Sequence, residues 1–270
     1  MKKFFTIGLF LVLALATGAA LAAKPGLPQN ARKAMIPASA VQVAPSVYYL
    51  GQKTRGGEAV EGFAFVHHSE NYAKGGNGGG RGGGASSCYA FLAKGAKWKA
   101  LEPYIVNPWN TKGLSESFVM SNLAFSIGKW EAAAGIDLLG DGNATNETLE
   151  VDFDEPDGLN EAYFGDVAQN GAIAITVVWG VFGGSVGNRK LIEWDMVFDQ
   201  VDFDWSASGE PNKMDFENIA THELGHGVGL NDLYDNKCSE QTMYGYAVEG
   251  ETKKRSLESG DAAGVKALYA

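Results

Sequence analysis

Three candidate metal ligands and one candidate base lie within residues 222–232. His222 and His226 are four residues apart, so on a helix their side chains point the same way and can bind one metal ion. Glu223 adjoins the first histidine, where its carboxylate can act as a base without binding the metal. Gly229 can end the helix in a left-handed conformation, which would bring Asp232 towards the same ion. No histidine follows His226, so Asp232 is the candidate third ligand.

Two imidazoles and one carboxylate match the three protein ligands that hold zinc in hydrolytic enzymes, where the fourth position is left for water. Zinc lowers the pKa of such a water from about 16 towards ~7, and Glu223 is the natural general base, later returning the proton to the leaving amine. A carboxylate at Asp232 lowers the positive charge of the site, so the water should be somewhat less acidic. A bare His-Glu-x-x-His also occurs by chance, but Gly229 and Asp232 at this spacing favour a metal site.

The motif requires a helix that aligns its two histidines. Either Asn212 or Asp215 can cap this helix, and Phe216, Ile219 and Ala220 would face the core. Each glycine inside the helix costs roughly 1 kcal/mol relative to alanine. Helix propensity therefore does not explain these glycines, and another structural requirement must.

Two further helices are predicted from apolar residues at helical spacing. Ser115 can cap the first and Gly135 can end it, while Ser259 can cap the second, which closes the chain. The apolar positions are Val119, Leu123, Ile127 and Trp130 in the first helix, and Ala262, Val265, Leu268 and Tyr269 in the second.

Runs of apolar, β-branched and alternating residues predict the strands. They lie at residues 47–50, 61–66, 104–106, 149–153, 171–182 and 192–199. Gly56-Gly57 separates the first two strands and can form a turn. His67-His68 follows the second strand, and a histidine pair in that place is more typical of a polar surface than of a metal site.

Residues 1–22 have the order of a secretory signal peptide, with Lys2 and Lys3 before an apolar run and small residues at its end. The alternative is an uncleaved membrane anchor, although the run is shorter than the ~20 residues that span a bilayer. We expect an N-terminal segment at residues 23–85, a candidate pro-region, with a glycine-rich linker at 75–84. Residues 86–270 would form the main domain.

The formal net charge of −10 argues against a nucleic-acid partner, because phosphates favour a basic surface. In an exported chain, Cys88 and Cys238 suggest one disulfide that closes a long loop. The alternative is a free thiolate that binds zinc. No stretch after the signal could span a membrane, so we expect a secreted protein without stable membrane association.

These motifs resemble the metzincin clan of zinc metallopeptidases, whose signature is His-Glu-x-x-His-x-x-Gly-x-x-His or Asp followed by a methionine-containing turn. Thr242-Met243-Tyr244-Gly245 is similar to that turn. From about Lys97 to its end, the chain is most similar to the matrixins within the clan. The likeness is carried by Lys97-Trp98, residues 104–107, Ala124-Phe125, Lys129-Trp130 and residues 264–269, with Asp261 at the acid that supports the methionine turn.

The resemblance implies an α+β fold: a twisted, mostly parallel five-stranded sheet with one antiparallel edge strand, an active-site helix, a methionine turn and a C-terminal helix. It also implies that a peptide substrate binds along the edge strand, here residues 172–176, by backbone hydrogen bonds. Judged from its residues alone, that run is equally a buried core strand. Tyr244 would help to form the pocket for the residue after the cut, and Met243 would pack beneath the ligands.

The chain departs from the animal matrixins in three respects. Its third ligand would be Asp232, no histidine between His68 and His222 can bind a second, structural zinc, and Cys88 lacks the motif of the pro-segment cysteine that silences those enzymes. Latency by a thiol switch is therefore not expected. Acid-rich loops at residues 137–147 and 154–157 could bind calcium (Ca2+), but such loops are more often solvated turns.

We therefore predict a secreted zinc (Zn2+) endopeptidase that acts on protein or peptide substrates. His222, His226 and Asp232 would bind the metal, and Glu223 would be the general base. The alternative is a secreted, non-catalytic binding module that zinc stabilises. Intact Glu223 favours the peptidase, since a degenerate site would most easily lose that residue.

Overall fold

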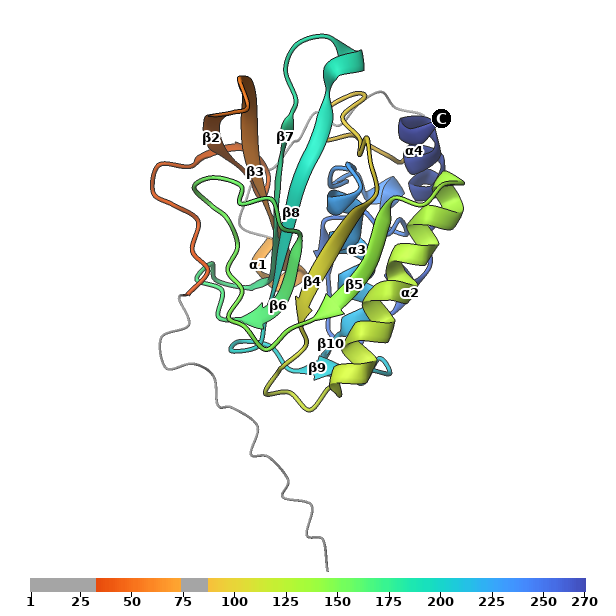
Figure 1. Ribbon diagram of the computed structural model, residues 1–270. Coiled ribbons are helices and arrows are strands. Elements are labelled where there is room, and N and C mark those ends of the chain that lie inside the picture. The colour runs from red at the N-terminus through yellow and green to blue at the C-terminus, as the bar shows by residue number, and fades with distance from the viewer. Residues whose placement is uncertain (1–32, 74–86) are drawn as a thin grey trace, which may run out of the picture. The chain divides into compact units, whose positions relative to one another are not determined.

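A mixed nine-stranded sheet organises the chain in the computed structural model, which describes residues 33–73 and 87–270 (Figure 1). The predicted signal peptide and glycine-rich linker lie outside these ranges. Five strands follow the order β5-β4-β6-β8-β7, in which only β7 is antiparallel to its neighbour. They are β4 (Glu102–Asn107), β5 (Leu139–Ala144), β6 (Glu161–Gly165), β7 (Ala172–Val181) and β8 (Lys190–Asp199). This arrangement confirms the predicted fold class.

Three strands of the N-terminal segment extend this sheet beyond β7. They are β1 (Val41–Ala44), β2 (Val47–Arg55) and β3 (Glu58–Ser69). β2 and β3 form the hairpin predicted around Gly56 and Gly57, whose φ angles of 58° and 84° suit a two-residue turn with positive φ at both positions. β7 is an inner strand rather than the expected edge strand, because β3 pairs along its free side.

Three long helices form where the sequence predicts them. They are α2 (Glu116–Ala134), α3 (Phe216–Gly227) and α4 (Ser259–Tyr269). Ser115 caps α2 with its side chain, Gly135 ends it with a φ of 76°, and the predicted apolar stripe is buried. The N-cap of α4 is Glu258, one residue before the predicted Ser259, and its N–H donates to the side chain of Asp261. No helix in the described ranges is long and apolar enough to cross a membrane.

The remaining elements are short. α1 (Glu70–Ala73) follows β3, β9 (Trp205–Ser206) pairs with β10 (Met214–Asp215), and β11 (Tyr246–Ala247) pairs in parallel with the end of β3. Short 3-10 helices lie at Val186–Asn188, Asn236–Cys238 and Lys253–Arg255.

Residues 149–153 do not form the predicted strand. Leu149 and Val151 are buried, as the alternation requires. The backbone N–H groups, however, donate to side chains of other segments: Glu150 to Glu161, Val151 to Tyr163, and Asp152 to Asp195. Side chains thus provide the hydrogen-bond partners of this backbone, and no neighbouring strand is needed. The alternation of apolar and acidic residues here indicates only that one face of the segment is buried.

Two apolar cores lie against the sheet. The larger core joins residues of α2, α3 and α4 to the sheet, and the smaller core contains sheet residues together with Val151 and Val167. β3 contributes to both, with Phe65 in the larger core and Ala64 in the smaller one. The N-terminal strands therefore share the cores of the main domain.

Candidate metal centre

Helix α3 carries both histidines of the motif. Of the two predicted caps, Asp215 is the one observed, and it accepts a backbone N–H of the first turn at 3.0 Å. Arg255 forms an ion pair with the Asp215 carboxylate, with 2.6 Å between Nη2 and Oδ2. The chain leaves the helix at Gly229, whose φ of 103° is readily adopted only by glycine. This turn brings Asp232 back towards the histidines.

The three candidate ligands converge at the end of α3. Asp232 Oδ1 lies 3.2 Å from His222 Nε2 and 3.5 Å from His226 Nε2. One ligand atom from each residue lies within 4.8 Å of the others, and all three residues are buried. Burial opposes the charged form, but the nearby histidines outweigh it and hold the pKa of Asp232 well below its usual value. The site therefore presents a carboxylate to two imidazoles.

The hydrogen bonds around these side chains leave their metal-binding atoms free. His222 Nδ1 donates to the carbonyl of Thr242 at 2.7 Å, and His226 Nδ1 donates to that of Leu230 at 3.0 Å. The lone pair of each imidazole is then on Nε2, as in a metal ligand oriented by its second nitrogen. His222 Nε2 and Asp232 Oδ1 are buried without a hydrogen-bond partner. Unpaired buried atoms of this kind suit a zinc ion.

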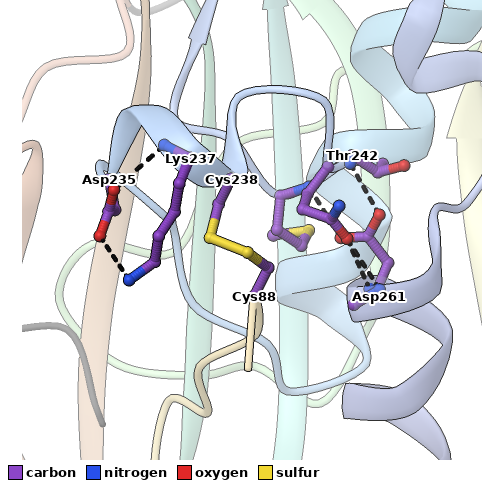
Figure 2. The surroundings of a disulfide bond; sticks show 9 residues. Cys88, Asp235, Lys237, Cys238, Thr242 and Asp261 are labelled. Carbon is purple, nitrogen blue, oxygen red and sulfur yellow. Dashed lines mark hydrogen bonds and ion pairs between the residues drawn. A yellow bond between two sulfur atoms is a disulfide. The ribbon is translucent and has the colours of Figure 1, made fainter. Parts of the chain in front are cut away.

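The methionine turn packs directly beneath α3. A Cβ atom at Gly225 would lie 2.1 Å from Met243 Sδ, so no larger residue fits there, and this contact explains the glycine within the helix. Asp261 supports the turn by accepting the N–H of Thr242 at 2.7 Å and that of Met243 at 3.1 Å (Figure 2). Tyr244, within the turn, is half-buried.

The predicted disulfide is present between Cys88 and Cys238, close to the methionine turn (Figure 2). It joins the segment before β4 to the 3-10 helix that precedes the turn. Both sulfur atoms are bonded, so neither cysteine offers a thiolate to a metal.

Both oxygens of the Glu223 carboxylate are hydrogen-bonded. The Thr176 hydroxyl donates to Oε2 at 2.6 Å, and His67 Nδ1 donates to Oε1 at 2.9 Å. The prediction of a polar surface is wrong for His67, which is 2 % exposed because β3 continues past it inside the sheet. Burial lowers its pKa to about 3, so the imidazole is neutral near pH 7. Phe63, Phe65 and His67 alternate along the sequence, and this alternation could have predicted that the His67 side chain is buried on the same face of the strand as the two phenylalanines.

A cluster of three acidic residues lies away from the candidate metal centre. Asp152, Glu193 and Asp195 bring carboxylate oxygens within 4.8 Å of one another, and Glu193 Oε1 has no hydrogen-bond partner. Neither loop named for calcium, at residues 137–147 or 154–157, contributes to any group of three candidate metal ligands among the described residues. Residues 139–144 of the first loop form β5 instead.

This carboxylate cluster predicts a pH-dependent stability. Burial raises the pKa of Glu193 to about 8, so the folded protein binds a proton that the unfolded chain releases near the ordinary value of 4.5. The stabilisation is present below pH 4.5 and is lost as the pH rises through about 8. Glu193→Gln should be more stable than the wild type at pH 8 by on the order of 1–3 kcal/mol, with little difference at pH 4.5.

Urea denaturation in calcium-free buffer at the two pH values measures this difference. Glu249→Gln, at an exposed site, is the control and should follow the wild type. An equal pH dependence in Glu193→Gln and the wild type would contradict the prediction.

Comparison with known families adds a finding that is independent of the geometry. Residues 98–270 match the family model described as Matrixin. The match includes α3, the methionine turn and α4, and it begins after the three N-terminal strands. A search of curated proteins finds no significant match to the chain.

Proposed function

Because the chain belongs to the matrixin family of zinc metallopeptidases, we propose that it is a secreted zinc endopeptidase. His222, His226 and Asp232 bind the zinc ion, and Glu223 is the general base. The observation that carries this proposal is the convergence of three buried ligands beside a buried carboxylate, with His222 Nε2 and Asp232 Oδ1 lacking hydrogen-bond partners. Residues 86–270 are the catalytic domain in this proposal.

Each residue of the site has a separate role in the proposed hydrolysis. Bound zinc supplies Lewis-acid chemistry and lowers the pKa of a water molecule. Glu223 takes the proton of the attacking water on one oxygen and delivers it to the leaving amine, while Thr176 orients the other oxygen. The negative charge of Asp232 makes the site less positive than one with three histidines, so the catalytic pKa should be higher than in such a site.

The proposed substrate is a protein or peptide in an extended conformation, bound beside β7 with Tyr244 near the residue after the cut. Secretion is supported by residues 1–22 and by the disulfide, which is typical of oxidising compartments. The acidic net charge gives no reason to propose a nucleic-acid partner.

The second candidate function is a non-catalytic module that zinc stabilises. One observation favours it: each Glu223 oxygen already accepts a hydrogen bond from a protein group, which makes the carboxylate a weaker base in this conformation. The two functions differ in whether the secreted protein cleaves peptides.

Metal removal tests both candidates. Chelation with 1,10-phenanthroline should abolish casein or peptide cleavage by the secreted protein, and stoichiometric zinc should restore it. If free zinc is 1,000 times Kd, its loss costs about 4 kcal/mol of stability, equivalent to about 10 °C in Tm. A fall in Tm without cleavage in either state would favour the non-catalytic module, and cleavage that survives zinc removal would rule out the mechanism.

A further inference from the structure

Strand β3 lies beside the candidate metal centre, with β7 along one side and with β2 and β11 along the other. Along one side, residues 61–68 pair antiparallel with β7, from Glu61 opposite Gly180 to His68 opposite Ala172. At the far end of the strand, on its other side, His68 and Ser69 pair in parallel with β11, which follows the methionine turn. β3 therefore takes the backbone positions on β7 that an extended substrate would need.

Two side chains of β3 cover the residues proposed for catalysis. The Phe65 ring stacks on the His226 imidazole, with centroids 4.3 Å apart and 18° between the planes. The His67 ring lies 3.9 Å from that of His222. Phe65 and His67 are each 2 % exposed, so β3 excludes solvent as well as substrate from this side of the site.

The same strand also occupies the proposed base. His67 Nδ1 donates to Glu223 Oε1, and Thr176 already donates to Oε2. A zinc-bound water would need one of these oxygens as its proton acceptor. With β3 in place, His67 competes with such a water for Oε1, and its hydrogen bond makes the carboxylate a weaker base.

Resting on the proposed function, we infer that β3 is an intramolecular inhibitor that fills the substrate cleft and weakens the base through His67. A thiol does not take part, since Cys88 is in the disulfide. Binding of β3 is strong because Ala64 and Val66 lie in the smaller core while Phe65 lies in the larger one. The chain between this strand and the catalytic domain is rich in glycine at residues 75–84, where a cut would free the strand.

The test uses the full chain with a site-specific protease sequence placed within residues 75–84. Before cutting, the protein should cleave a fluorogenic peptide at least about 10-fold more slowly than after cutting and dilution, because only the fraction with an open cleft is competent. Added synthetic peptide of residues 58–73 should restore inhibition of the cut protein by raising KM with kcat unchanged.

In the uncut chain, Phe65→Asp should raise the rate of peptide cleavage by a similar factor, since a charge at this buried position disfavours docking of β3.

Val41→Asp is the matched control, because Val41 is a β1 residue that is 58 % exposed, and it should leave the uncut chain as slow as the wild type. Binding of fluorescent 58–73 peptide to the cut protein, and its exclusion from the uncut protein, gives a readout that does not need catalysis. Peptide binding without any cleavage would support the inhibitory position of β3 while refuting the proposed peptidase. Equal cleavage before and after cutting, or no binding of 58–73 to the cut protein, would overturn the inference and leave β3 as a permanent structural strand.

Discussion

Glu223→Ala is expected to lower kcat for peptide cleavage about 10³-fold, within the range that general-base catalysis contributes. The carboxylate lies beside the candidate metal centre, buried and oriented by Thr176, and the other acid in the groups formed there, Asp232, is the proposed metal ligand. Zinc content should stay unchanged, because the ligand set does not include Glu223. The measurement compares kcat and bound zinc in the variant and the parent, both cut within residues 75–84 so that the cleft is open.

Two further variants define the cause of the loss. Glu223→Gln keeps the shape of the side chain without its basicity and should be as inactive as Glu223→Ala. Glu217→Ala, in the first turn of the same helix, removes an acid that pairs with Lys129 and should retain activity. Wild-type activity in Glu223→Ala would end the proposed mechanism.

Asp261→Ala is expected to destabilise the protein by on the order of 3–5 kcal/mol and to weaken zinc binding about 10–100-fold. Asp261 is fully buried and accepts three backbone N–H groups, from Thr242, Met243 and Glu258. Alanine would leave these donors without a partner in a region closed to water. Zinc affinity should fall as well, because the Thr242 carbonyl in the same turn orients His222.

Urea denaturation and competitive zinc titration measure the two effects separately. Asp261→Asn retains one acceptor oxygen and the side-chain volume, so its losses should be smaller. A variant Asp261→Ala with the wild-type midpoint would show that the methionine turn does not depend on this support.

The sequence by itself determined the local features of the site. Four-residue spacing aligns His222 with His226 on one helix, and Gly229 permits the left-handed turn that returns Asp232. Such features depend on residues close in sequence, which is why they could be predicted without the fold. Ser115 and Gly135 mark the ends of α2 for the same reason.

Only the tertiary structure decided what lies against those residues. His67 contacts Glu223 across a separation of 156 residues, and strand pairing of this kind depends on register and on which neighbour is free. The alternation of residues 149–153 could not reveal that side chains of distant residues would accept the backbone hydrogen bonds of this segment. β7 likewise has the composition of an inner strand or an edge strand, and the position of β3 decides between them. Local spacing thus determined which side chains could carry out the chemistry, whereas long-range pairing decided which of them are covered.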